Sequence, residues 1–323
     1  QVVVKINVSS DEEEMFIREA DIGIRLGHAT RSIPSFAKTM GALDCNVYQD
    51  PISKSFDFRQ MCVATGMPAN YIFMELVKGT SFSKFVEDRS TSQHRILCAL
   101  GQLFLGLEYA KRKVGFTHYD LHLQNIIYSD FPKPSGLPTF KKYTFKIDGN
   151  EYSIPAYGNI TIIDFGRAYM NGATPVTIEP FHREYGIKLN STKQSVEIFV
   201  VTMCLLMELV RSRRDLLVPP NDGLLKFIRF ILGKYWEMYK PVAGGNRMNV
   251  MIDEFIRTRR VEVFTLNRRD GINREDPHTL EYGLDINFTP LDCYKTIMQL
   301  LNPPEYPPNV ERCYWGDYDV TQL

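Results

Sequence analysis

The sequence has no excess of either charge, no closely paired cysteines and no long uninterrupted apolar run. Its 323 residues contain 38 Lys and Arg against 38 Asp and Glu, so net charge argues neither for nor against nucleic acid. The six cysteines include no Cys-x-x-Cys pair, which argues against zinc and favours a reducing compartment. The longest apolar run, 196–210, contains glutamates and is too short to span a bilayer. We expect a cytoplasmic protein without a membrane span and without a nucleic-acid partner.

The sequence also begins without a methionine or a signal peptide. Gln1 leads directly into a β-branched, strand-like run, so we expect the chain to be a fragment or a trimmed form. Hydrophobic residues make up 44% of the chain, which is typical of a folded globular protein with room for one large domain or two lobes.

The spacing of apolar residues divides the chain into a strand-rich first part and a mainly helical second part. The first part has a helical pattern from about residue 11 to 28, and it ends at the break formed by Lys78, Gly79, Thr80 and Ser81. Strands are predicted at 2–8, 35–40, 60–64, 71–74 and 160–163, with a β-hairpin around the turn 148–150. Helices are predicted near 93–113, 195–210, 223–239, 247–258 and 290–301, with an extended tail at 303–308. These elements predict an α+β fold.

Oxygen-bearing side chains recur at a fixed spacing in the second part. Asp120 and Asn125 bracket a polar loop after a helix, in the pattern His-x-Asp-x₄-Asn that starts at His118. Asp164 ends an apolar strand and begins the sequence Asp-Phe-Gly. Two carboxylates and an amide oxygen brought together suit a hard cation such as Mg²⁺. A lone Asp at a strand end is usually a turn residue, so the interpretation depends on the joint spacing.

These patterns resemble the catalytic loop and the metal-binding motif of protein kinases. Residues 74–82 resemble the hinge between the two lobes of that family, and residues 3–5 resemble the strand that carries its ATP-binding lysine. The resemblance covers about residues 1–210 and implies a bilobal fold that binds ATP and Mg²⁺. The implied parts are an N-lobe at 1–74, a hinge at 75–81 and a C-lobe at 82–323 with a β-hairpin insert at 131–158.

The resemblance implies a role for each residue around the phosphates. Lys5 would hold the α- and β-phosphates, and Glu19 would keep Lys5 in place by an ion pair, with Glu14 as the alternative acid. Asp120 would accept the proton of the substrate hydroxyl and orient that hydroxyl for in-line attack.

The same resemblance implies the metal ligands and the adenine pocket. Asn125 and Asp164 would bind Mg²⁺. Main-chain groups of Glu75 and Val77 would meet the edge of the adenine, and Met74 would lie at the back of the pocket.

Some residues of the catalytic loop depart from the family pattern. Tyr119 replaces an arginine that normally pairs with a phosphate on the activation loop, so we expect constitutive activity or control by other means. His122 replaces a lysine that contacts the γ-phosphate in protein Ser/Thr kinases, and it is either a catalytic residue or a structural histidine. The sequence Asp-Leu-His is also found in haspin-like kinases and in aminoglycoside- and choline-type small-molecule kinases.

Other family features are absent or altered. No Ala-Pro-Glu follows Asp164, and the helix predicted at 195–210 lacks the aspartate that the family carries near its start. The Gly-rich loop is missing, and the resemblance places it before Val2. Residues 152–167 resemble the divergent Ser/Thr kinases of large DNA viruses, and for a viral protein we expect the host cytoplasm or the virion as its location.

Three functions therefore remain open from the sequence. The first is a protein Ser/Thr kinase that transfers the ATP γ-phosphate to a protein hydroxyl with Mg²⁺. The second is a small-molecule phosphotransferase of related fold, and the third is a nucleotide-binding pseudokinase. The presence of Lys5, Asp120, Asn125 and Asp164 argues against the third. The sequence predicts no oligomeric state.

Overall fold

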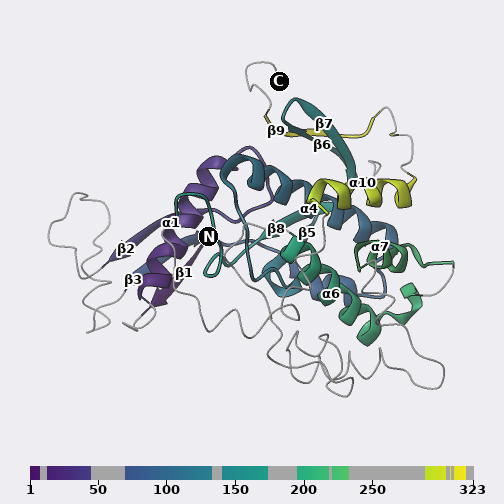
Figure 1. Cartoon of the computed structure of the whole chain (residues 1–323), viewed down its shortest axis with the longest axis horizontal. Coiled ribbons are helices and arrows are strands. Elements are labelled where there is room, and N and C mark those ends of the chain that lie inside the picture. The colour runs from purple at the N-terminus through teal and green to yellow at the C-terminus, as the bar shows by residue number, and fades with distance from the viewer. Residues whose placement is uncertain are drawn as a thin grey trace, which may run out of the picture.

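The chain folds into small β-sheets packed with helices, as the computed structural model in Figure 1 shows. It describes residues 1–7, 13–44, 70–132, 140–173, 195–217, 220–232, 288–302, 306 and 309–317. The described strands form three three-stranded sheets, so the predicted α+β class is confirmed. The division into an N-lobe, a hinge and a C-lobe stays a prediction.

The first sheet lies beside helix α1 (Glu13–Ala29) at one side of the molecule (Figure 1). It is antiparallel, with β3 (Asn70–Glu75) between β1 (Val2–Asn7) and β2 (Thr39–Asp44). Phe16 and Ala20 of α1 pack on Ile72, with Met74 beside them. The burial of this apolar stripe holds α1 against the strands.

The predicted strand at 35–40 is displaced in the structure. The regular strand β2 begins only at Thr39, while Phe36 makes an isolated bridge to Ile162. The Ala37 N–H donates to the Ile162 carbonyl at 2.9 Å, so this stretch is joined to a second sheet before it enters the first. The strand predicted at 60–64 lies outside the described residues.

Helix α4 (Gln93–Val114) forms the centre of the core. The Ser92 side chain caps its start by accepting from the Arg95 N–H, and Gly115 ends it in the left-handed conformation (φ 60). Every residue from 96 to 110 is buried, so α4 is enclosed on all sides. The helix predicted at 93–113 is therefore confirmed.

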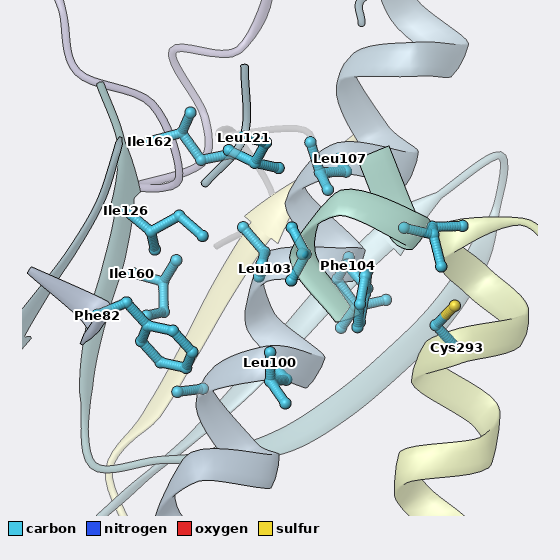
Figure 2. Close-up of a cluster of buried hydrophobic side chains, with 14 of the residues drawn as sticks. Phe82, Leu100, Leu103, Phe104, Leu107, Leu121, Ile126, Ile160, Ile162 and Cys293 are labelled. Carbon is cyan, nitrogen blue, oxygen red and sulfur yellow. The ribbon is translucent and has the colours of Figure 1, made fainter. Parts of the chain in front are cut away.

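The second sheet packs on α4 and brings the loop at residue 120 to the core. Its strands are β4 (Thr80–Ser81), β5 (Ile126–Asp130) and β8 (Gly158–Ile162), all antiparallel. Figure 2 shows Ile126, Ile160 and Ile162 facing α4, with Leu121 of the loop beside them. Burying each such side chain contributes about 1.5–3 kcal/mol, which anchors the loop between sheet and helix.

The third sheet contains a hairpin and a strand from the end of the chain. The hairpin joins β6 (Lys141–Ile147) to β7 (Asn150–Ala156), and both turn residues, Asp148 and Gly149, have positive φ. The hairpin expected at this turn is present. Strand β9 (Arg312–Gly316) pairs parallel with β6 and was not predicted, because its residues are separated from β6 by more than 160 others. Among the residues expected to form the extended tail at 303–308, only Tyr306 is described.

The remaining helices surround the other sides of α4 (Figure 1). They are α3 (Phe82–Glu87), α6 (Ser195–Ser212), α7 (Gly223–Leu232) and α10 (Pro290–Leu301), with short 3₁₀ turns η2 (Leu123–Asn125) and η3 (Arg214–Leu217). A capping box between Thr289 and Asp292 begins α10, and Cys293 points toward α4 in Figure 2. Helices predicted at 195–210 and 290–301 are confirmed; that at 223–239 is described to residue 232, and that at 247–258 lies outside the described residues. Within the described part, every helix is too short or too polar to cross a membrane.

Candidate active site

The candidate site is built around a lysine that contacts two carboxylates. The Lys5 Nζ of β1 lies 2.6 Å from Glu19 Oε2 of α1 and 3.4 Å from Asp164 Oδ1, which follows β8. Glu19 is 4% exposed, whereas Lys5 and Asp164 are 41% and 48% exposed. The structure thus brings together three residues from separate elements, and Glu19 is the acid that pairs with Lys5.

Lys5 and Asp164 stabilise each other's charge, whereas burial and the neighbouring Asp164 raise the pKa of Glu19 above its ordinary value. Burial by itself would lower the pKa of Lys5, but the carboxylates of Glu19 and Asp164 together raise it above its ordinary value. Burial would likewise raise the pKa of Asp164, but Lys5 and the Gly166 N–H hold it below its usual range. Lys5 is therefore cationic and Asp164 anionic at neutral pH, which suits contacts with a phosphate and with a metal ion.

Asp120 and Asn125 share a loop that is tied directly to the residue before Asp164. Asn125 Nδ2 donates to the Asp120 carbonyl at 2.9 Å, and the Ile163 N–H donates to the Asn125 carbonyl at 3.0 Å. Since the Asn125 amide nitrogen is used in this way, its Oδ1 is the atom suited to a cation. The two predicted metal ligands thus follow adjoining, hydrogen-bonded segments.

His118 connects the loop to the end of β8. It is fully buried, and burial lowers its pKa to about 4, so the ring is neutral. Its Nε2–H donates to the Ile163 carbonyl at 3.0 Å, while Nδ1 accepts from the Asp120 N–H at 3.3 Å. These two bonds define the tautomer and hold the loop against the strand.

Glu197 of α6 supports the loop from the opposite side, and sequence reasoning missed it. Its Oε1 accepts from the main-chain N–H groups of His118 and, at 3.2 Å, of Tyr119. Burial raises the pKa of Glu197 to about 7. We expected this helix to lack a supporting aspartate; a glutamate in its first turn is directed at the loop instead. The signal was an isolated acid at the start of an apolar run.

Two residues of the site have left-handed backbones. Tyr119 has φ 61 and Asp164 has φ 64, a conformation that costs about 1–3 kcal/mol for a residue other than glycine. Tyr119 is 7% exposed, and Asp164 is followed by the buried Phe165, so packing and hydrogen bonds on either side maintain both conformations. Such strain is typical of functional sites.

Further side chains complete the surroundings of Asp120 and Asp164. Arg167, which sequence reasoning missed, places Nη1 3.6 Å from Asp120 Oδ1. Phe165 is buried against Phe116 and His118, with ring centroids 6.1 and 6.0 Å apart. This packing turns the Phe165 ring into the core while Asp164 faces Lys5.

The predicted adenine-binding residues lie at the end of β3. Met74 pairs with Val3 in the register that also pairs Lys5 with Ile72, so Met74 lies on the same face as Lys5, about 7 Å along the strand. The Glu75 N–H donates to the Lys38 carbonyl at 2.9 Å, so a contact of the Glu75 main chain with adenine would fall to its carbonyl.

Among the contacts of the described residues, Val77 and His122 take part in neither the ion pairs nor the hydrogen bonds of Lys5. Within the described part of the chain, the Val77 N–H donates to no main-chain carbonyl, as an adenine-binding amide requires. His122 Nδ1 is buried without a hydrogen-bond partner among the same residues. Their proposed roles stay predictions.

The donor set fits Mg²⁺ better than a metal held by protein alone. Among the described residues, no group of three or more His, Cys, Asp and Glu side chains could hold an ion. Mg²⁺ commonly takes only one or two protein oxygens and completes its shell with phosphate and water. Asp164 with Asn125 Oδ1 meets that requirement.

Comparisons with known proteins point in the same direction. No protein-family model matches the chain. Over 165 residues, 51% of this chain, it is 28% identical to "Probable kinase 098L" of Invertebrate iridescent virus 3. Over 78 residues, 24% of this chain, it is 30% identical to "Uncharacterized protein 038R" of the same virus. The chain spans about a quarter of the first relative (26%) and 12% of the second. The similarity indicates a distant, kinase-like relationship.

Proposed function

We propose that this chain is an ATP-dependent phosphotransferase with a bilobal, kinase-like arrangement, and that it acts as a protein Ser/Thr kinase. The observation that carries the proposal is the contact of Lys5 with both Glu19 and Asp164, at 2.6 and 3.4 Å. A cation held between a buried acid and an exposed, ionised carboxylate is the arrangement that phosphate and metal binding require together.

The residues of the chain take separate tasks in this mechanism. Lys5 binds the phosphates, and Glu19 keeps its ammonium group in place. Asp164 and Asn125 would hold Mg²⁺, which would neutralise the charge of the phosphates. Asp120 accepts the proton of the acceptor hydroxyl, and its contact with Arg167 at 3.6 Å directs its carboxylate.

A protein hydroxyl is the acceptor that we favour. The support is the Asp-Phe-Gly sequence and the segment around Met74, Glu75 and Val77, both of which resemble protein kinases. The alternative, a small-molecule acceptor, rests on His122 within Asp-Leu-His. The distant relationship to a protein named a probable kinase supports phosphoryl transfer without distinguishing the two.

The test is phosphate transfer by the purified chain with Mg²⁺ and labelled ATP. We expect label on Ser and Thr of a mixed protein substrate. Asp120→Asn should lower the rate by about 10²–10⁴-fold, because it removes the proton acceptor but keeps the shape of the side chain. Asp148→Asn in the β6–β7 turn is the matched control and should leave the rate unchanged.

The other outcomes separate the alternatives. Transfer only to aminoglycoside or choline-like acceptors, abolished by Asp120→Asn, would replace the protein acceptor by a small molecule. Nucleotide binding without transfer to any acceptor would refute catalysis and favour a pseudokinase.

A further inference from the structure

Helix α1 carries two arginines, besides Glu19, that reach the segment after Asp164. Arg18 Nη2 donates to the Ala168 carbonyl at 2.9 Å. Arg25 donates to the Asn171 carbonyl at 2.8 Å and to the Gly172 carbonyl at 3.2 Å. Donors and acceptors are 146 to 150 residues apart in the chain. All three acceptors are main-chain carbonyls, so the contacts need no charged or modified side chain in the segment.

The surface of α1 lies close to this segment along several turns. A Cβ at Gly23 would lie 3.4 Å from the Phe165 ring and 2.1 Å from Thr39 Oγ1, so only glycine fits there. A Cβ at Gly166 would lie 3.2 Å from Glu19 Oε2. Gly23 lies one turn after Glu19, and Arg25 lies two turns after Arg18, so two adjacent faces of α1 are directed at Lys5 and at the segment after Asp164.

The opposite side of the segment is joined to residues just before the catalytic loop. Tyr169 and Thr117 exchange two main-chain hydrogen bonds, at 2.7 and 2.9 Å. The Asn171 N–H donates to the Val114 carbonyl at 3.0 Å. Residues 168–172 are thus held between α1 and the segment 114–117.

Charge-assisted hydrogen bonds of this kind are the stronger ones in proteins. Arg18 is 7% exposed, so its bond to Ala168 is shielded from water. If α1 moved outward, it would break the Lys5–Glu19 pair and would also leave the buried Arg18 guanidinium without this acceptor. The positions of α1 and of the Asp164 loop are consequently coupled.

We propose that Arg18 and Arg25 are positioning residues that lock α1 to the Asp164 segment, so that Glu19, Lys5 and Asp164 are in place without phosphorylation. This inference rests on the proposed function for its consequence in catalysis. In this proposal, helix α1 orders the segment after Asp164. In the family that the sequence resembles, a phosphate on the activation loop and an arginine of the catalytic loop do this, and Tyr119 occupies the position of that arginine.

The test measures amide hydrogen exchange and phosphate transfer in the full chain. Arg25→Ala is the main variant, because its side chain is 40% exposed and its loss should not unfold the protein. Amides of residues 168–173 should exchange about tenfold faster or more, which corresponds to the loss of at least one hydrogen bond to a charged group. The transfer rate should fall by a similar factor with the melting temperature nearly unchanged, and Arg25→Lys should restore part of both.

The controls address the other contacts of Arg25. Asp21→Asn removes the ion pair between Asp21 and Arg25, which are 3.2 Å apart, but leaves the hydrogen bonds from Arg25 to the main-chain carbonyls. This variant should change neither amide exchange at 168–173 nor the rate of phosphate transfer. Arg31→Ala removes an exposed arginine just beyond α1 and should also have no effect. Arg18→Lys should accelerate exchange at Ala168 and its neighbours.

Two results would overturn the inference. One is unchanged exchange at 168–173 in the double variant of Arg18→Lys and Arg25→Ala. The other is a large loss of the wild-type rate after phosphatase treatment. Faster exchange in the variants of a chain that transfers no phosphate would refute the proposed function and still support the coupling, so the two failures are distinguishable.

Discussion

At the scale of single residues, buried polar side chains decide the geometry of the site. His118 and Glu197 are 0% and 1% exposed, yet neither is proposed to touch a substrate. Each holds main-chain groups of the loop at residues 118–120, and together they keep Tyr119 in its left-handed conformation. Their burial is what makes their hydrogen bonds effective, because unpaired polar groups in the core are costly.

The burial of Glu197 predicts a dependence of stability on pH. Its pKa rises from an ordinary 4.5 to about 7 in the folded protein. Between these values the folded state keeps a proton that the unfolded chain has released, so the free energy of unfolding falls as pH rises. The full effect is about 3 kcal/mol. Glu197→Gln keeps an acceptor oxygen but cannot ionise, so its stability should lack this decline.

Urea unfolding from pH 4.5 to 8 measures the difference. The free energy of unfolding of Glu197→Gln should increase relative to that of the wild type as pH rises, by up to about 3 kcal/mol. Glu208→Gln on the same helix is the control; it loses the contact with Arg211 at 2.8 Å and should be less stable at pH 7. Parallel curves for Glu197→Gln and the wild type would contradict the prediction.

At the scale of elements, α4 owes its central place to close approaches at its glycines. A Cβ at Gly101 would lie 2.1 Å from Ile154 Cδ1 of β7. A Cβ at Gly106 would lie 2.6 Å from Ser35 Cβ, in the loop that leads to β2. The helix thus contacts the hairpin on one side and the Ser35 loop on another, and glycine allows both contacts.

The same substitution at two helical glycines should have opposite effects on stability. Gly106→Ala introduces a contact that a backbone shift must relieve, which should destabilise the protein by about 1–3 kcal/mol. Gly27→Ala in α1 has no atom within 4 Å of the new Cβ and should stabilise by about 0.5–1 kcal/mol. Thermal unfolding of both variants measures this, and equal shifts of either sign would refute it.

At the scale of the whole molecule, distant parts of the chain meet at the C-terminal end of α4. The Gly316 N–H at the end of β9 donates to the Ser32 carbonyl at 3.2 Å, just after α1. Asp317 contacts Lys113 at 2.7 Å and Tyr109 at 3.2 Å, both on α4. The last described residues are therefore attached to the turn that follows the helix carrying Glu19.

Ligand binding should stabilise this assembly as a unit. If Lys5, Asn125 and Asp164 bind a nucleotide with Mg²⁺, saturating Mg²⁺-ADP at about 100 times its Kd should add about 2.7 kcal/mol and raise the melting temperature by several degrees. Lys5→Met should abolish most of the shift, and Lys84→Met on α3, which is exposed, should keep it. Equal shifts in the wild type and Lys5→Met would contradict a phosphate-binding role for Lys5.

Much of the local structure could be predicted because it depends on near neighbours in the sequence. The periodic apolar residues of α4, the turn at Asp148 and Gly149, and the Asp-Phe-Gly sequence each carry a local signal. Strand β9 could not be predicted, since its pairing with β6 joins segments that lie about half the chain length apart. No local sequence pattern marks the missed residues Glu197, Arg18 and Arg167, because only the fold brings them to the loops that they contact.

By itself, the sequence determined which residues could do chemistry: Lys5, Asp120, Asn125 and Asp164, in an order and spacing that resemble one family. Only the tertiary structure decided that Glu19 pairs with Lys5, that Glu197 accepts hydrogen bonds from the loop, and that arginines of α1 donate hydrogen bonds to the segment after Asp164. The physical reason is the difference in the range over which local and tertiary interactions act. Backbone propensity and spacing act over a few residues, whereas hydrogen bonds and ion pairs act over a few ångströms between residues that only folding brings together.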